Sequence, residues 1–186
     1  MINHQDFIKK YLLELKEVLD NLSVEDLAEV IVTLENVHKE KRQVFLAGNG
    51  GSAATAGHMA NDLMLGVTKK QPYGFRAFSL ADSIAPVSAI ANDTAYSEIF
   101  AAQLKQLASK NDLLIIFSAS GNSPNIVRAL EEAEALGMQT IAFLGMGGGK
   151  AASMADKTVI VPSNEYGPIE DVHMIFDHII AGYFQQ

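Results

Sequence analysis

The chain has no cysteine among its 186 residues. It can therefore form no disulfide and offers no thiolate nucleophile, and any zinc ion would have to be held by histidine and carboxylate side chains. The sequence also lacks an uncharged apolar run approaching the roughly 18 residues of a membrane-spanning helix. Its N-terminal stretch, MINHQDFIKK, has no apolar segment of the kind found in a secretory signal. Together these absences predict a cytoplasmic protein with no membrane partner.

Positive charge is scarce as well: 14 lysines and arginines stand against 22 aspartates and glutamates, for a net charge of −8. This balance argues against direct nucleic-acid binding, which needs a basic surface. A small anionic ligand remains compatible, because local backbone N–H groups can outweigh an unfavourable net charge. With 48% hydrophobic residues, the length suits a single domain over residues 1–186, in which helices in 1–40 precede an α/β core in 41–186.

The segment VFLAGNGGS, residues 44–52, is the most informative part of the chain. An apolar run typical of a buried strand leads into a glycine-rich turn, and helical spacing begins at Ala53. Strand, glycine-rich turn and helix are the elements with which α/β proteins hold a phosphate, because the glycines let the backbone approach and the first helical N–H groups point at the anion. The turn predicts ligand contacts from Asn49, Gly50, Gly51 and Ser52.

A second junction of the same kind lies in LLIIFSASGNS, residues 113–123. Its strand runs into a turn that carries Ser118, Ala119, Ser120 and Ser123. Two serine-bearing turns, each behind an apolar strand, predict a small phosphorylated ligand. An alternative makes Ser52 a helix N-cap, and Ser123 before Pro124 an N-cap with proline at the first helical position. The two interpretations are compatible, since a capped N-terminus and a phosphate site use the same N–H donors.

Strands and helices are expected to alternate after residue 43. The predicted strands are 43–48, 75–79, 113–118, 139–144 and 157–161, and the predicted helices are 53–65, 97–108, 124–136, 149–154 and 169–184. Continuous apolar strands favour a parallel sheet covered on both faces, whose ligands bind beyond the carboxyl ends of the strands. The run Gly147–Gly149 is interpreted as a loop into a short helix. Two amphipathic helices, about 4–22 and 23–38, suggest an N-terminal helical hairpin that covers its own core or a partner subunit.

Two helical segments carry side chains capable of chemistry. His58 and Asp62 are spaced by four and therefore share one helix face. The segment IEDVHMIFDHII adds four more candidates: Glu170, His173, Asp177 and His178. Imidazole and carboxylate groups on two helices could enclose a divalent metal, usually zinc for such ligands, or form an acid–base pair for proton transfer.

Each candidate also has a structural alternative. His58 and Asp62 form a favourable exposed pair on any helix. His178, flanked by apolar residues, could be a hydrogen-bonded core histidine. His173 and Asp177 are expected on the surface or as a helix-stabilising pair. A glutamate near a helix start, such as Glu170, interacts well with the helix dipole whatever its function.

Five segments in a fixed order carry a family resemblance. In this order and spacing they resemble the sugar isomerase (SIS) domain family, and within it the phosphoheptose isomerases. The replication-initiator-associating protein is a non-catalytic relative. The resemblance covers nearly the whole chain and rests on GNGGSAATAGHMANDL (48–63), VSAIANDTAYSEIF (87–100), SASGNSPNIVRAL (118–130), MGGGKAASMAD (146–156) and VPSNEYGPIEDVHMIFDHII (161–180).

The resemblance implies a three-layer αβα sandwich around a central parallel five-stranded sheet, assembled as a homotetramer with active sites between subunits. It implies that the phosphate is held by Ser52 and the second turn, and that Asp93, in the turn Ala91–Asp93, lies near the substrate. It also implies one Zn²⁺ per subunit, with proton transfer by Asp62 and His178. Because eight residues separate Glu170 from His178, the choice of His178 over His173 comes from the resemblance alone. The implied metal ligands are His58, Asp62, Glu170 and His178.

The implied reaction is aldose–ketose isomerisation of sedoheptulose 7-phosphate to D-glycero-D-manno-heptose 7-phosphate through an enediol. Several positions depart from the family pattern, which has glutamate, glutamine, aspartate, arginine and threonine where this chain has Asp62, Glu170, Gly167, Gly66 and Ala119. With Gly66 in place of arginine, the nearest cations are Lys69 and Lys70. An isomerase for another sugar phosphate is therefore an alternative, as is a non-catalytic sugar-phosphate sensor or assembly protein.

Overall fold

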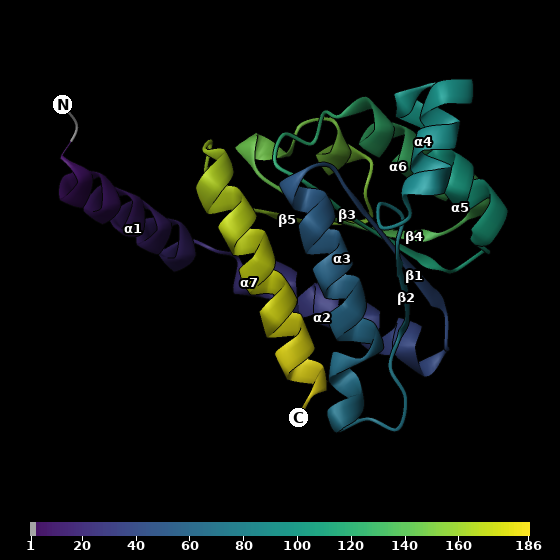
Figure 1. The fold of residues 1–186 in the computed structure, drawn as a ribbon. Coiled ribbons are helices and arrows are strands. Elements are labelled where there is room, and N and C mark those ends of the chain that lie inside the picture. Colours follow the sequence, from purple (N-terminus) through teal and green to yellow (C-terminus); the bar gives the residue numbers. More distant parts are fainter. Residues whose placement is uncertain (1–2) are drawn as a thin grey trace.

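A five-stranded parallel sheet forms the centre of the protein in a computed structural model, which describes residues 3–186 (Figure 1). Its strand order is β2-β1-β3-β4-β5, with all neighbours parallel. The strands are β1 (Gln43–Gly48), β2 (Arg76–Ser79), β3 (Leu113–Ser118), β4 (Gln139–Leu144) and β5 (Lys157–Ile160). All five lie where the apolar runs predict them, which confirms the expected α/β sheet.

Helices cover both faces of this sheet, and the expected three-layer sandwich is confirmed. Figure 1 shows α3 and α7 side by side over one face, with α2 beneath them, while α5 and α6 cover the other face. The helices are α1 (His4–Asp20), α2 (Val24–Lys39), α3 (Gly51–Met64), α4 (Ile84–Asp93), α5 (Ala101–Leu107), α6 (Pro124–Leu136) and α7 (Tyr166–Phe184). Among residues 3–186, no helix combines the length and apolar character needed to cross a bilayer.

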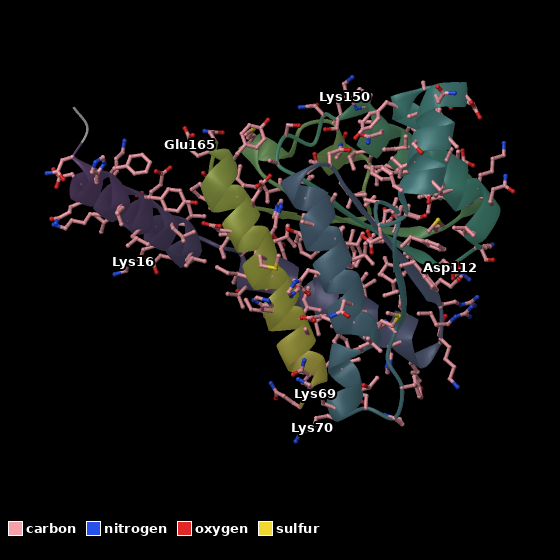
Figure 2. The ribbon with its side chains drawn as sticks, in the orientation of Figure 1. Lys16, Lys69, Lys70, Asp112, Lys150 and Glu165 are labelled. Carbon is pink, nitrogen blue, oxygen red and sulfur yellow. The ribbon has the colours of Figure 1, made fainter. Side chains whose placement is uncertain are left out.

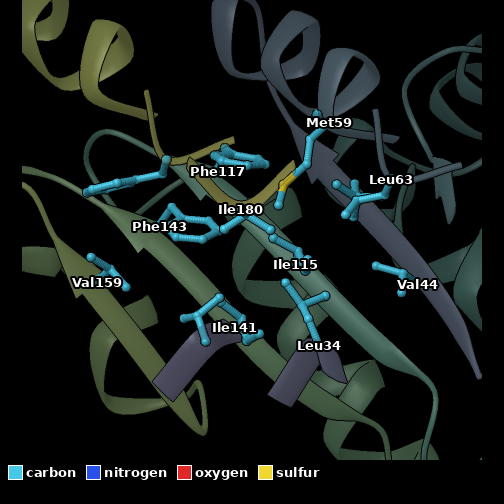
Figure 3. Packing of buried hydrophobic residues seen from close by; sticks show 14 of the residues in the cluster. Leu34, Val44, Met59, Leu63, Ile115, Phe117, Ile141, Phe143, Val159 and Ile180 are labelled. Carbon is cyan, nitrogen blue, oxygen red and sulfur yellow. The ribbon is translucent and has the colours of Figure 1, made fainter. Parts of the chain in front are cut away.

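Alternate residues of each central strand serve the two layers. Ile115 and Phe117 of β3 join the cluster under α2, α3 and α7 (Figure 3). Ile116 belongs to the cluster under α5 and α6. This is why β3 is buried along its whole length. Burial of one such side chain contributes about 1.5–3 kcal/mol, so the strands that carry the site lie in the best-packed part of the molecule.

The two N-terminal helices are present and begin with side-chain caps. Asn3 accepts a hydrogen bond from the backbone N–H of Gln5, and Ser23 accepts one from that of Asp26. They then occupy different places: α2 lies against β5, while α1 extends away from the sheet (Figure 1). A hydrogen bond of 2.6 Å from Tyr11 Oη to Asp171 Oδ2 ties α1 to α7.

The structure differs from the sequence-based expectation in three segments. The predicted helix 97–108 is a 3-10 turn at Tyr96–Glu98 followed by the shorter α5. The predicted helix 149–154 is wrong: the segment forms 3-10 turns at Met146–Gly148 and Ala151–Ser153, because Gly147, Gly148 and Gly149 adopt positive φ angles that an α-helix cannot contain. Helix α4 was not predicted, and Asp93 is its last residue rather than part of a turn. No residue of α4 is fully buried, and its core-facing side is formed by the partly buried Val87, Ile90 and Ala91.

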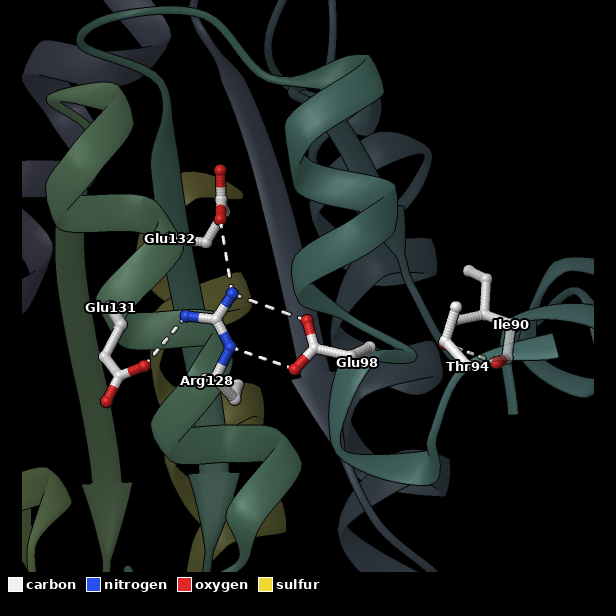
Figure 4. Close-up of polar contacts among 6 residues, drawn as sticks. All are labelled: Ile90, Thr94, Glu98, Arg128, Glu131 and Glu132. Atoms are coloured by element: carbon white, nitrogen blue, oxygen red, sulfur yellow. Dashed lines mark hydrogen bonds and ion pairs between the residues drawn. The ribbon is translucent and has the colours of Figure 1, made fainter. Parts of the chain in front are cut away.

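An ion-pair cluster joins the segment after α4 to α6. Arg128 of α6 donates to Glu98 across 3.0 Å, and it also contacts Glu131 and Glu132 of its own helix (Figure 4). Arg128 and its partners are about one third exposed or more, apart from Glu132, so the cluster contributes modestly to stability. The ion pair between Glu98 and Arg128 holds residues 96–98 against α6, the helix that starts at the second serine turn.

Candidate functional site

The two serine turns meet at the point where the sheet topology reverses. From β1 the chain adds β2 on one side of the sheet and β3 on the other, so that β1 and β3 are neighbours whose following loops diverge. In open parallel sheets such a point leaves a crevice beyond the carboxyl ends of the two strands. Asn49 follows β1 directly and Ser118 ends β3, which places both predicted ligand turns at this crevice.

A pocket of about 230 Å³ occupies the crevice. Ser52 of the first turn and Ser120 of the second both line it, so the expectation that the two turns share one site agrees with the geometry. Glu170 enters the same pocket from α7. Within residues 3–186 the lining does not include Asp93, which lies at the end of α4. The full lining is Asn49, Ser52, Phe117, Ser118, Ala119, Ser120, Ser123, Tyr166 and Glu170.

The first turn brings the start of α3 to the pocket. Gly50 is the N-cap residue and has φ +55°, a left-handed conformation that favours glycine. Ser52 is therefore the second residue of α3, and the prediction that it serves as an N-cap is wrong. The Asn49 side chain is held in place by the amide of Asn125, at 2.9 and 2.7 Å, and by a 3.0 Å hydrogen bond from Tyr96 Oη.

The second turn is held by its own hydroxyls and by the glycine run after β4. Ser118 Oγ accepts a hydrogen bond of 3.1 Å from the N–H of Gly121. Gly121 has φ +62°, and a Cβ atom there would meet the carbonyl oxygen of Gly148. Ser123 is the N-cap residue of α6, followed by Pro124 as predicted, but its side chain makes no capping hydrogen bond within the described chain. Its hydroxyl is thus available to a ligand.

Electropositive character in this pocket comes from backbone rather than from side chains. Over the described residues, the lining contains no lysine or arginine, and its one charged group is the Glu170 carboxylate. The N-termini of α3 and α6 supply unpaired N–H groups and the positive ends of two helix dipoles. Lys69 and Lys70 lie at the opposite end of α3, about 20 Å away by helix rise (Figure 2).

Glu170 lies directly over the start of α3. A Cβ atom at position 51 would come 2.5 Å from Glu170 Oε2, so a larger residue there would displace the end of the Glu170 side chain. Glu170 is eight residues before His178 on α7, which corresponds to about 12 Å along the helix axis. Of the four predicted metal ligands, the structure therefore brings three together, while Glu170 lines the pocket at the two serine turns.

Those three side chains form a compact cluster between α3 and α7. His58 Nε2 lies 3.4 Å from His178 Nε2 and 3.5 Å from Asp62 Oδ2. A fourth group is present: Asp177 Oδ2 lies 3.6 Å from His58 Nε2. One donor atom from each of the four side chains lies within 4.8 Å of all the others.

The spacing and chemistry of this cluster fit a divalent metal ion. Metal bonds of about 2.0–2.2 Å place the ligand atoms of a tetrahedral zinc site roughly 3.3–3.6 Å apart. Burial raises the pKa of Asp177 from 3.8 to about 6, with a further increase from the charge of Asp62, while His58 and His178 act in the opposite direction. A cation in the cluster would favour the ionised carboxylate, so the residues present could hold a metal.

The structure corrects three sequence-based expectations in α7. Asp177 and His173 are 0% and 1% exposed, so the prediction that they lie at the surface is wrong. His178 is exposed, and the core-histidine alternative is wrong as well. The signal was present in the spacing, because Ile169, Val172, Phe176 and Ile180 define the buried stripe of α7, and positions 173 and 177 fall within it.

Comparison with known proteins identifies the family. The SIS domain profile matches residues 6–145, and the chain belongs to the SIS domain family. It is similar to the phosphoheptose isomerase of Helicobacter pylori (strain P12), with 41% identity over 178 residues that cover 96% of this chain and 88% of the relative.

Two solved structures share the fold over nearly the whole chain. The phosphoheptose isomerase from Francisella tularensis superposes with a TM-score of 0.90 at 27% identity and covers 100% of both chains. The phosphoheptose isomerase from Neisseria gonorrhoeae superposes with a TM-score of 0.91 at 26% identity and covers 98% of each. The resemblance seen in the sequence motifs is therefore confirmed.

Proposed function

We propose that this protein is an aldose–ketose isomerase of sugar phosphates, converting sedoheptulose 7-phosphate to D-glycero-D-manno-heptose 7-phosphate. The observation that carries the proposal is the meeting of the two serine turns in one pocket, beside helices that bear imidazole and carboxylate groups. The close relatives named phosphoheptose isomerase support the same reaction.

The pocket binds the phosphate at one end and the sugar at the other. Backbone N–H groups of α3, together with the hydroxyls of Ser52, Ser120 and Ser123, bind the phosphate oxygens. Asn49, Gly50, Gly51, Ser118 and Ala119 complete this surface. A carboxylate repels a phosphate, so Glu170 faces the sugar hydroxyls, and Asp93 approaches the substrate from α4. Anchoring the phosphate lowers the entropy lost when the reacting carbons are aligned.

Asp62 and His178 carry out the proton transfer. One of them removes a proton from C1 of the ketose while the carbonyl oxygen on C2 gains a proton, which gives the enediol. A proton is then returned to C2 while the hydroxyl on C1 loses its proton, which forms the aldose. His58, Asp62 and His178 would hold one divalent metal ion per subunit, while Glu170 lines the pocket at the serine turns. When bound, a zinc ion supplies a Lewis acid for the carbonyl oxygen. Exposure of His178 and partial exposure of Asp62 allow both to reach a substrate.

The chain acts as a single SIS domain, residues 1–186, in a cytoplasmic homotetramer with sites between subunits. Residues 1–40 contribute to its assembly. Phe7, Ile8, Leu12 and Leu13 of α1 are exposed apolar residues, which suits packing against another copy. A hollow of about 1030 Å³ between α1 and the start of α7 leaves space for that copy.

A substrate panel tests the proposal. The purified chain is incubated with ketose and aldose phosphates of five, six and seven carbons, with and without added Zn²⁺, and products are measured by a coupled assay. We expect turnover of sedoheptulose 7-phosphate to exceed that of the other sugars. Preferred turnover of another sugar would change the substrate, and binding without turnover of any sugar would support a regulatory protein instead.

A further inference from the structure

Asp177 is the most deeply buried member of the cluster between α3 and α7. Its side chain is 0% exposed, and neither carboxylate oxygen has a hydrogen-bond partner within residues 3–186. A buried carboxylate without a partner is costly, and such groups are retained where they pair with a charge or coordinate a metal. The cost therefore needs a compensating interaction that the protein side chains do not supply.

The Asp177 carboxylate is directed at the donor atoms of its neighbours. Oδ2 lies 3.6 Å from His58 Nε2, a distance too long for a hydrogen bond but suited to two ligands of one ion. The 3.5 Å ion pair between His58 and Asp62 and the 3.4 Å hydrogen bond between His58 and His178 also have lengths suited to two ligands of one ion. All four side chains thus point toward one common position.

Glu170 is unsuited to complete the same set. Its carboxylate lies over Gly51 and lines the serine pocket, and it is not among the side chains whose ligand atoms lie within 4.8 Å of one another. Its backbone position on α7 precedes His178 by eight residues, about 12 Å of helix rise. The charge balance points the same way: two aspartates neutralise a divalent ion, whereas a third carboxylate would leave the site negative.

We infer that Asp177 is a metal ligand of this protein, completing the set with His58, Asp62 and His178, and that Glu170 remains a substrate-pocket residue. The inference rests on the proposed function for the presence of a metal, but it assigns the ligands from this chain's own geometry. Because Asp177 is fully buried, it contacts no substrate and acts through the metal alone.

Two variants of α7 with the same chemical change provide the test. Asp177→Asn and Glu170→Gln each convert a carboxylate to an amide, one in the cluster and one in the pocket. Zinc affinity is measured on the metal-free full chain by competition with a chelating dye. We expect one zinc per wild-type chain, a loss of at least about 100-fold in affinity for Asp177→Asn, and a change within about threefold for Glu170→Gln.

A third variant keeps the test decisive if Asp177→Asn folds poorly. The chain has no cysteine, so Asp177→Cys introduces its only thiol. With cobalt(II) in place of zinc, we expect a near-ultraviolet sulfur-to-cobalt charge-transfer band that is missing from the wild type. A purely structural aspartate would give no such band.

Several results would overturn the inference. They are wild-type protein that binds no zinc, Asp177→Asn that keeps wild-type affinity, Glu170→Gln that loses as much affinity, or Asp177→Cys without the band. Isomerase assays separate this inference from the proposed function. A wild type that binds zinc through Asp177 but converts no sugar phosphate would support the inference and contradict the proposed function. An active enzyme whose Asp177→Asn variant keeps its zinc would support the proposed function and contradict the inference.

Discussion

The position of His178 in the structure differs from the one that its sequence neighbours suggest. Its apolar neighbours suggested a core histidine, but they occupy the other faces of α7, and His178 itself is exposed beside His58. Asp177 is the opposite case: carboxylates are rarely fully buried, so its residue type predicts a surface position, whereas its spacing places it within the buried stripe of α7. The position of His58 and Asp62 on one face of α3 could be predicted from a spacing of four, whereas contacts between α3 and α7 depend on tertiary packing that no local pattern contains.

Replacement of His178 tests its role in proton transfer. We expect His178→Ala to lower kcat by about 10²–10⁴-fold, the usual contribution of a general acid or base, and more if the metal is lost as well. The matched control is His4→Ala, an exposed histidine on α1, for which kcat should stay at the wild-type value. Wild-type turnover by His178→Ala would remove this residue from the mechanism.

His173 predicts a pH dependence of stability. Burial lowers the pKa of His173 from 6.5 to about 4. At a pH between these two values, the imidazole is therefore protonated in the unfolded chain but neutral in the folded protein. The stability it contributes is present above pH 6.5 and is lost as the pH falls toward 4. Asp177 acts in the opposite sense, because its raised pKa gives stability that is lost as the pH rises from 3.8 through about 6.

Comparison with His173→Phe isolates the histidine, because Asp177 is common to both proteins. Urea unfolding in a chelator at pH 7.5 and pH 5 gives the free energy of unfolding of each. We expect the wild type to lose, relative to His173→Phe, on the order of 2 kcal/mol of unfolding free energy when the pH falls from 7.5 to 5. A difference that does not change with pH would contradict the low pKa of His173.

At the scale of elements, the strands were predictable and the short connections were not. β1, β3 and β4 carry continuous apolar runs that only a sheet covered on both faces can bury. The segment after β4 has no such constraint, since three glycines with positive φ allow a backbone path that propensity does not describe. This path brings Gly148 against Gly121, so the third glycine turn supports the second serine turn.

Gly121→Ala tests that support, with Gly147→Ala as its matched control. Both glycines have positive φ, and each substitution costs about 1–2 kcal/mol of backbone strain. Only position 121 faces a close neighbour, the carbonyl of Gly148, whereas nothing lies within 4 Å of a Cβ at position 147.

We therefore expect Gly121→Ala to displace the second turn. The KM for the sugar phosphate should rise about tenfold or more, the loss of roughly one hydrogen bond to a charged group, and Gly147→Ala should keep the wild-type KM. Steady-state kinetics and thermal melting measure the two effects. An equal KM for both variants would show that the contact between the two turns does not position the phosphate site.

At the scale of the whole molecule, α1 is the feature that a single chain does not explain. It projects from the core with Leu12 and Leu13 at 59% and 68% exposure (Figure 1). The amphipathic pattern predicted the helix, but its partner could not be read from one sequence, because the same apolar stripe suits an internal or an external contact. The side-by-side placement of α3 and α7 likewise depends on how the layers assemble.

Leu13→Glu is expected to dissociate the proposed tetramer, because it places a charge in the apolar face of α1. The control is Leu107→Glu, the same change at a 54% exposed position on the opposite layer. Light scattering after size-exclusion chromatography should report a smaller species for Leu13→Glu and a tetramer for the control. A tetramer in both cases would exclude this face from the assembly.

The most direct test of the central claim is proton exchange during turnover. The zinc-loaded wild type is incubated with sedoheptulose 7-phosphate in D₂O, and the sugars are followed by NMR. An enediol formed by a protein base that exchanges with solvent predicts heptose 7-phosphate carrying deuterium at C2, and ketose that gains deuterium at C1 on reversal. Folded, metal-loaded protein that yields neither product nor exchange would contradict isomerisation at the pocket where the two serine turns meet.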